Sequence, residues 1–364
     1  MTASPPSTRP PAAGLEQRLT RAWLVRGPVA CALLPLAGLY LSLAALRRLL
    51  YRLGVLRSQR LAVPVCVVGN RVAGGAGKTP TTIAVVRHLQ SRGLRVGVVS
   101  RGHGRKGVAP LRVGPHSRAQ DVGDEPLLIQ RRTGAPVLVG RDRVQAGQEL
   151  LRQEPSLDLI VCDDGLQHLR LARDVDILVF DERGGGNGWP LPAGPLREPV
   201  GWRGWAPRLL VLYNAGRPTT RLPGTLGRRR LHHLVPLADW WAGRPGMAAD
   251  QWRPTGAQPP WALAGIAVPQ RFFDELQRAG IAVRGLPLPD HADLSALPWP
   301  DEATELIVTE KDAVKLDAAD VAARRPATRV WVATLDFEPD PAFWCDLHAA
   351  LPPPLRERLR GPRA

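Results

Sequence analysis

Short apolar runs recur along this chain and are separated by stretches long enough to form helices. The runs are rich in valine, isoleucine and leucine. Runs of this kind between helix-length stretches predict the strands of a parallel α/β sheet. The expected strands lie at residues 63–68, 95–100, 136–140, 157–162, 175–180, 209–213, 261–267 and 306–309, and the first expected helix lies at residues 81–91.

The pattern changes between residues 181 and 205, where glycine, proline and tryptophan replace the aliphatic runs. Connections of this length are usually functional or disordered, so we expect a long loop. Strands resume after about residue 208, and this favours a larger α/β domain at residues 55–205 and a smaller α/β domain at residues 206–364. In parallel sheets, ligands bind beyond the carboxyl ends of the strands, so polar residues at these ends are the candidates for chemistry.

The segment 27–46 contains no charged residue and is followed by Arg47, Arg48, Arg52 and Arg57. Twenty helical residues span about 30 Å, the thickness of the hydrocarbon core. The segment therefore predicts a membrane-anchoring helix within residues 1–54, after a loose tail at residues 1–14. The arginines indicate that the following chain faces the cytoplasm. A helix that crosses the bilayer and a helix that lies at its interface both remain open, because proline, glycine and serine interrupt the apolar run.

The chain of 364 residues has a formal net charge of +16, and only four of its basic residues are lysines. A GC-rich genome produces such an arginine bias, and a surface that binds acidic partners is the functional alternative. The chain has no pattern typical of nucleic-acid-binding modules, so we expect a lipid partner and no nucleic acid. The four cysteines are scattered, which predicts a reduced protein without disulfides or structural zinc.

A glycine-rich turn follows the first expected strand and ends in Lys78 and Thr79. Glycines let backbone N–H groups turn toward a phosphate, the lysine reaches the β- and γ-phosphates, and the threonine hydroxyl coordinates Mg²⁺. Val72 stands where the strict P-loop pattern has its first glycine, so the turn is similar to a Gly-Gly-x-Gly-Lys-Thr variant. We predict an ATP-binding loop made of Val72, Ala73, Gly74, Gly75, Ala76, Gly77, Lys78 and Thr79.

Asp163 and Asp164 directly follow the expected strand 157–162. A P-loop needs an acidic partner at the end of a neighbouring strand. One of these carboxylates would hold Mg²⁺, and the other would orient a water molecule or a hydroxyl group. The sequence does not decide which aspartate binds the metal ion, and a pair that only caps the strand is the alternative.

Together with further motifs, these residues resemble the tetraacyldisaccharide 4′-kinase family, the lipid A kinases of Gram-negative envelopes. The resemblance covers nearly the whole chain. The motifs lie at residues 33–40, 69–80, 100–105, 123–126, 163–168, 191–198, 269–273, 290–291 and 309–316. The resemblance implies an ATP-dependent phosphotransferase at the cytoplasmic face of the inner membrane, with Mg²⁺ as cofactor. Its expected substrate is the 4′-hydroxyl of a tetraacylated glucosamine disaccharide 1-phosphate.

The resemblance also implies roles for single residues. Asp124 matches the catalytic aspartate and His291 the histidine that pairs with it, and such a pair suits removal of a proton from a weakly acidic sugar hydroxyl. Lys78 and Asp164 complete the expected catalytic set. The expected metal ligands are Thr79, Asp163, Asp164 and Glu198, and the expected substrate or phosphate contacts are Arg101, Gln167, His168 and Arg197.

Two positions depart from the family pattern. His103 stands where tyrosine is usual, and Ala292 and Asp293 follow His291 where a second histidine or an aromatic residue is common. A variant P-loop ATPase that acts as a membrane switch or positioning protein is the alternative. Such an ATPase typically carries a lysine where this chain has Ala73, and it needs no Asp–His pair. A membrane adaptor with an inactive site conflicts with the intact Lys78 and Thr79.

Overall fold

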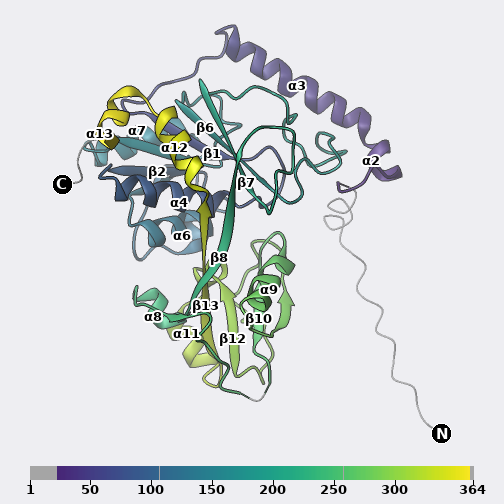
Figure 1. Cartoon of the computed structure of the whole chain (residues 1–364), viewed down its shortest axis with the longest axis vertical. Coiled ribbons are helices and arrows are strands. Elements are labelled where there is room, and N and C mark those ends of the chain that lie inside the picture. Colours follow the sequence, from purple (N-terminus) through teal and green to yellow (C-terminus); the bar gives the residue numbers. More distant parts are fainter. Residues whose placement is uncertain (1–22, 106, 257, 361–364) are drawn as a thin grey trace.

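The computed structural model describes residues 23–105, 107–256 and 258–360, so the expected tail at residues 1–14 lies outside them. The chain forms an upper and a lower lobe, and two long strands run between the lobes (Figure 1). Within the described residues, thirteen strands join into one mixed sheet whose pairs are mostly parallel. The predicted α/β class is confirmed.

The sheet of the upper lobe has the strand order β3-β4-β2-β5-β1-β6-β7. All of its neighbouring strands are parallel except β3 and β4. Its central strands are buried on both faces, which explains why their sequences are almost continuously apolar. The strands are β1 (Val65–Gly69), β2 (Val96–Ser100), β3 (Leu111–Val113), β4 (Val137–Val139), β5 (Leu159–Asp163), β6 (Val175–Asp181) and β7 (Arg208–Asn214).

Helices cover both faces of this sheet. Side chains of β1 alternate between two cores: Cys66 packs in the cluster that contains Leu89 and Leu127, and Val67 packs in the cluster that contains Leu150. The first cluster includes α4 (Lys78–Ser91), α6 (Asp124–Thr133) and α12 (Pro341–Ala350), and the second includes α7 (Arg143–Gln153). The short helix α5 (Ala119–Val122) precedes α6, and α13 (Pro353–Arg360) follows α12.

The lower lobe is a smaller sheet of parallel and antiparallel strands with helices around it. Its helix α9 begins with Pro269 in the first turn and buries Phe272, Phe273 and Leu276 on one face, as expected for an amphipathic helix. The strands are β9 (Met247–Ala248), β10 (Trp261–Ala264), β11 (Arg284–Pro287) and β12 (Glu305–Thr309). The helices are α8 (Leu237–Trp241), α9 (Pro269–Arg278), α10 (Glu310–Ala313) and α11 (Ala318–Arg324).

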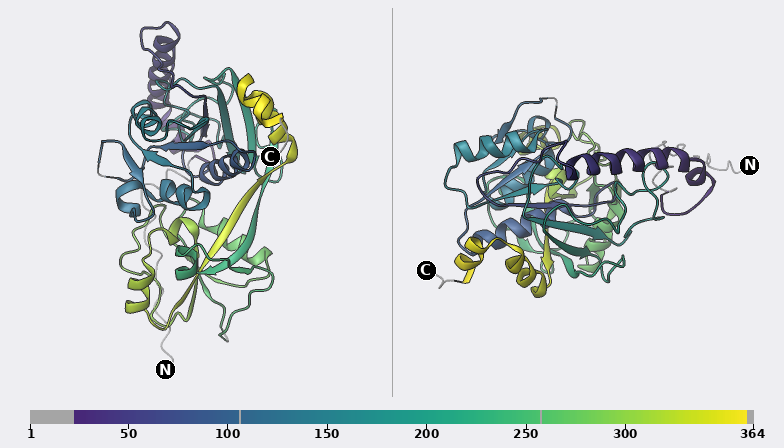
Figure 2. Two further views of the ribbon diagram at one scale, coloured as in Figure 1. Left: turned by 90° about the vertical axis from the view of Figure 1, so that its left-hand side faces the viewer. Right: turned by 90° about the horizontal axis from the view of Figure 1, so that it is seen from above.

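Two long antiparallel strands join the lobes. β8 (Thr225–Pro236) begins beside β7, and β13 (Arg329–Pro339) begins beside β12, so the two strands connect the upper and lower sheets. Their pairing shifts register between Thr334 and Leu335. The left view of Figure 2 shows both strands passing from one lobe to the other. After β13 the chain returns to the upper lobe as α12 and α13.

The observed elements match the expected strands to within a few residues at either end. No helix or strand lies between β6 and β7, as expected for the long loop. The spatial lobes, however, do not coincide with the sequence ranges 55–205 and 206–364. β7 pairs with β6, and α12 packs on β7 and β8, although all of these elements but β6 follow residue 206.

The uncharged N-terminal segment forms α2 (Pro28–Ala32) and α3 (Leu34–Arg52), which lie on the outside of the upper lobe (Figures 1 and 2). No helix in the described part of the chain is long and apolar enough to cross a membrane. One face of α3 contacts the body of the lobe. The Arg48 guanidinium lies 3.3 Å from Glu198 Oε2, and the Tyr40 hydroxyl donates a hydrogen bond of 2.9 Å to the Arg197 carbonyl.

Candidate active site

The glycine-rich turn lies between the end of β1 and the start of α4. Gly77 has a φ of 88°, and a Cβ at this position would overlap the side-chain amide of Asn214. Only glycine satisfies both conditions. The loop between β6 and β7 holds the turn in place, because Ala73 N donates a hydrogen bond of 2.7 Å to the Pro195 carbonyl. The backbone N–H of Arg197 likewise donates to the Arg71 carbonyl at 2.7 Å.

Lys78 ends in a small cluster of charged and polar groups. Its Nζ lies 3.6 Å from Asp164 Oδ1 and 3.5 Å from Asn70 Oδ1. Arg197 Nη1 lies 3.2 Å from the same oxygen of Asp164. Burial alone would raise the pKa of Asp164, but Lys78 and Arg197 lower it below its ordinary value. Asp164 is therefore ionised between two cations beside the P-loop.

Asp163 ends β5 directly beside the P-loop strand, in register with Val68 of β1. Its Oδ1 accepts a hydrogen bond of 2.7 Å from the Thr82 hydroxyl on α4. Burial and the nearby Glu125 carboxylate raise the pKa of Asp163 to about 7. The two neighbouring aspartates thus differ in environment, since Asp164 has cationic partners and Asp163 has none within ion-pair distance among the described residues.

The oxygen atoms near the P-loop fit Mg²⁺. Thr79 offers a hydroxyl, and Asp163 and Asp164 offer carboxylates, which are the ligands that this hard cation prefers. A cation would also favour the ionised form of the buried Asp163. Among the described residues, no three His, Cys, Asp or Glu side chains are grouped to hold a metal ion by themselves.

Asp124 and His291 meet at the junction of the lobes. Asp124 is buried at the start of α6, and its Oδ2 lies 3.0 Å from Nδ1 of His291 in the lower lobe. Burial would raise the pKa of Asp124, but the hydrogen bond from His291 and the charges of Lys311 and Lys315 lower it to about 2. The hydrogen bond to Asp124 in turn raises the pKa of His291.

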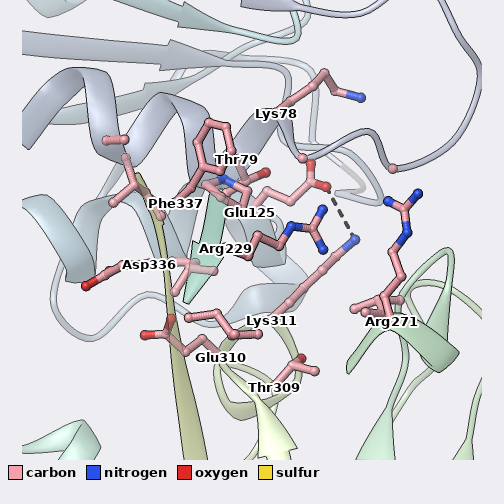
Figure 3. Close-up of a pocket in the computed structure, with 18 of the residues that line it drawn as sticks. Lys78, Thr79, Glu125, Arg229, Arg271, Thr309, Glu310, Lys311, Asp336 and Phe337 are labelled. Atoms are coloured by element: carbon pink, nitrogen blue, oxygen red, sulfur yellow. Dashed lines mark hydrogen bonds and ion pairs between the residues drawn. The ribbon is translucent and has the colours of Figure 1, made fainter. Parts of the chain in front are cut away.

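Lys311 lies among three carboxylates at the lobe junction, those of Asp124, Glu125 and Asp290. Its Nζ is 2.9 Å from Asp290 Oδ1, 3.3 Å from Glu125 Oε1 and 3.3 Å from Nε2 of His291. Burial would lower the pKa of Lys311, but Glu125, Asp124 and Asp290 raise it above its ordinary value. Figure 3 shows its side chain reaching from the lower lobe to Glu125 of the upper lobe. Lys311, within the motif at residues 309–316, thus links the lower lobe to the upper lobe.

The other expected substrate contacts differ in their surroundings. Gln167 Nε2 donates a hydrogen bond of 3.2 Å to the Asn70 carbonyl. His168 faces Asp142 at 3.6 Å, and burial and Arg143 lower its pKa to about 4. Arg101 is exposed. The roles of these residues in substrate binding stay predictions.

His103 and Glu198 have surroundings that their motifs do not reveal. The ring of His103 stacks on that of His291, with centroids 5.1 Å apart. The histidine that stands in place of the usual tyrosine thus lies against His291 of the Asp124–His291 pair. Glu198 is buried between Arg48 at 3.3 Å and Arg71 at 3.9 Å. Burial raises its pKa despite these arginines. Its role as a metal ligand stays a prediction.

A cavity of about 440 Å³ lies between the lobes and opens onto the P-loop. Lys78 and Thr79 line one part of it, and the apolar side chains of Ile83 and Phe337 line another. Its wall also contains residues that belong to no recognisable motif, because they come from the connecting strands and from the helix after them. They include Arg229, His232, Leu335, Phe337 and Trp344 (Figure 3 labels Arg229 and Phe337).

The fold and this site place the protein in the class of P-loop phosphotransferases. A model of the family described as tetraacyldisaccharide-1-P 4′-kinase matches residues 29–352. The chain therefore belongs to the tetraacyldisaccharide 4′-kinase family. The predicted family and enzyme class are confirmed, and the alternative of a membrane ATPase is not favoured.

Relatives at high identity match almost their full length. The tetraacyldisaccharide 4′-kinase of Methylibium petroleiphilum is 57% identical over 359 residues, covering 98% of this chain and 100% of that protein. The protein of the same name from Leptothrix cholodnii is 55% identical, covering 93% and 97%. LpxK from Aquifex aeolicus, solved in complex with ATP, is similar with a TM-score of 0.71 and 26% identity, covering 91% of this chain and 99% of that one.

Proposed function

We propose that this chain transfers the γ-phosphate of ATP to the 4′-hydroxyl of a tetraacylated glucosamine disaccharide 1-phosphate, a step of lipid A biosynthesis. The observation that carries this proposal is the Asp124–His291 pair at the lobe junction. The residues next to the pair in sequence, Glu125 and Asp290, line the same cavity as Lys78 and Thr79 of the P-loop. The P-loop supplies the phosphate-binding half of a kinase site. The pair supplies a base for the acceptor hydroxyl.

The protonation states derived above support this role. With Asp124 ionised, Nδ1 of His291 carries the proton that it donates to Asp124, and Nε2 has a free electron pair. A sugar hydroxyl at Nε2 loses its proton as the phosphoryl group arrives, and Asp124 stabilises the imidazolium that forms. Lys311 contacts Nε2 in this conformation, so the acceptor hydroxyl takes the place of the ammonium group.

The phosphate side of the reaction uses cations. Lys78 stabilises the negative charge of the transferring phosphate, and Arg197 lies on the other side of Asp164 in position to contribute a second positive charge. Thr79 with Asp163 or Asp164, and Glu198 as a further candidate, would hold Mg²⁺. The ion would neutralise phosphate charge when bound.

We further propose that the enzyme works at the cytoplasmic face of the inner membrane, where α3 contacts the lipid. Leu36, Leu39, Leu43 and Leu46 share one face of α3, and each is about half exposed or more. Apolar side chains at this spacing with arginines at the helix end suit an interfacial helix. Tyr40 and Arg48 of α3 contact the body of the lobe.

The decisive experiment is transfer of label from γ-labelled ATP to a tetraacylated glucosamine disaccharide 1-phosphate by the purified protein with Mg²⁺ in detergent. We expect labelled lipid with the wild type, and a loss of turnover in Asp124→Ala that far exceeds any change in ATP affinity. Hydrolysis of ATP without labelled lipid would instead indicate a membrane ATPase. A rate of ATP hydrolysis that stays low until the lipid is added would support assembly of the site only when both substrates bind.

A further inference from the structure

One cation of the interlobe cavity, Arg229, reaches the P-loop from outside it. Arg229 belongs to β8, one of the two strands that join the lobes. Its Nε donates a hydrogen bond of 3.1 Å to Asn214 Oδ1 at the end of β7. Its Nη2 lies 3.3 Å from the position that a Cβ would take at Gly77, so the guanidinium lies against the P-loop backbone.

Two other arginines near this loop already have carboxylate partners, and Arg271 has a second one in Glu182, 3.6 Å from its Nη2. Arg183 Nη2 lies 2.9 Å from Asp181 Oδ2, and Arg271 Nη1 lies 3.1 Å from the same oxygen. Arg229 differs, because no carboxylate lies within ion-pair distance of it in the part of the chain that the structure describes. Burial and the charge of Arg271 lower the pKa of Arg229 to about 10, so the side chain is still protonated at neutral pH.

A half-buried cation without a counter-ion is unfavourable, and here it lies near a second cation, Lys78, and the N-terminus of α4. An anion bound in the cavity would attract both cations and make their closeness favourable. The guanidinium group carries donors in a fork that fits phosphate oxygens, and its terminal nitrogens remain available because only Nε contacts Asn214.

We propose that Arg229 binds the polyphosphate of the nucleotide, so that a residue of the lobe-joining strand contributes directly to ATP binding. This assignment rests on the proposed kinase function and extends its phosphate site beyond the P-loop and Arg197. The contact at Gly77 selects the nucleotide over the 1-phosphate of the lipid. It also means that bound polyphosphate lies against both β8 and the P-loop.

The test compares Arg229→Gln with a matched control in the neighbouring residue. Arg228→Gln removes the same charge from an exposed side chain on the opposite face of the strand. Binding of ATP and of AMP is measured by titration calorimetry on the full chain. We expect Arg229→Gln to weaken ATP binding roughly ten- to a hundred-fold, the usual loss for a hydrogen bond to a charged group. AMP binding and the Arg228→Gln variant should change little.

A second measurement needs no variant and therefore does not depend on folding of Arg229→Gln. Phenylglyoxal modifies accessible arginines, and mass spectrometry reports the fraction modified at each site. ATP should protect Arg229 more than AMP does, whereas exposed Arg228 should be modified equally in both. Equal protection by ATP and AMP, or none, would overturn the assignment.

The outcomes separate this inference from the proposed function. If the wild type phosphorylates the lipid but Arg229→Gln keeps its ATP affinity, the inference is wrong and the kinase function stands. If Arg229→Gln raises only the KM for the lipid, the residue binds the acceptor and not ATP. If the wild type neither binds ATP nor labels the lipid, both proposals fail.

Discussion

The Nδ1 atom of His291 lies 3.0 Å from Oδ2 of Asp124, and the two residues belong to different lobes. Asp124 is buried, while the histidine side chain is about one third exposed. His291 also has a φ of 60°, a left-handed conformation that is uncommon for a residue other than glycine. Asp124 is thus fixed in the upper lobe, and His291 reaches it from a loop of the lower lobe.

This pair should give the reaction an acidic limb in its pH dependence. Asp124 raises the pKa of His291 above its ordinary value of about 6.5, and only neutral His291 accepts a proton. Turnover should therefore fall as the pH drops through the raised pKa. In Asp124→Asn the limb should move to lower pH while the maximal turnover falls. A pH profile of lipid phosphorylation measures both, and an unmoved limb would mean that His291 is not the titrating group.

The same two pKa shifts predict how the stability of the contact between the lobes depends on pH. The raised pKa of His291 gives stability that is fully present below about pH 6.5 and is lost as the pH rises through the folded value. The lowered pKa of Asp124 gives stability that is present above about pH 4 and is lost as the pH falls through about 2. Thermal unfolding of the wild type and of His291→Gln between pH 5 and 8 should differ most at the acidic end.

Lys311→Met should damage both the lobe junction and the reaction. The substitution leaves Asp124, Glu125 and Asp290 close together without their shared cation, and loss of a buried partner costs about 3–5 kcal/mol. Thermal unfolding and turnover both report the loss. Lys311→Arg, which keeps the charge, is the control and should retain more of each. Equal effects of both variants would show that stability and turnover depend on the shape of the Lys311 side chain and not on its charge.

Gly77→Ala should abolish nucleotide binding. The alanine Cβ would overlap the Asn214 amide, press on Arg229 and require a φ of 88°. Gly280→Ala is the matched control, because Gly280 has a φ of 81° but open space around it. Both variants carry backbone strain of about 1 kcal/mol, so a difference between them in ATP affinity isolates the contact with the P-loop. Equal ATP affinities would contradict the proposed packing.

Replacement of Leu36, Leu39 and Leu43 by glutamine should release the protein from lipid vesicles without loss of ATP binding, because these side chains are exposed. Vesicle co-sedimentation measures the first property and calorimetry the second. Leu111→Gln removes an exposed leucine from β3 and is the control. Deletion of residues 1–54 is a poorer test, because it also removes Arg48, which pairs with the buried Glu198 at 3.3 Å.

The sequence predicts the central strands well because burial on both faces makes them short apolar runs. It also predicts the P-loop and Asp163, since both follow directly from strand ends. It does not predict β8 and β13. Residues 228–233 of β8 read Arg-Arg-Arg-Leu-His-His, without the apolar alternation of a half-buried strand, because this strand spans the gap between the lobes.

The parts of the site that the sequence could not reveal depend on contacts between distant residues. Arg48 and Glu198 pair across 150 residues, and Lys311 and Glu125 pair across 186. No local pattern marks either partner. Arg229 shows the same limit, because one of three consecutive arginines points toward the P-loop and only the pairing of β8 with β13 decides which.

The return of the chain to the upper lobe has a consequence for biosynthesis. Phe343 and Leu347 of α12 are buried in the same core as Leu89 of the P-loop helix, yet they follow all elements of the lower lobe in the sequence. A ribosome releases residues in order, and the upper lobe therefore lacks part of its core until α12 has been made, after the whole lower lobe. The lower lobe emerges earlier and in one stretch. The nucleotide-binding half of this enzyme, although encoded first, is the half that matures last.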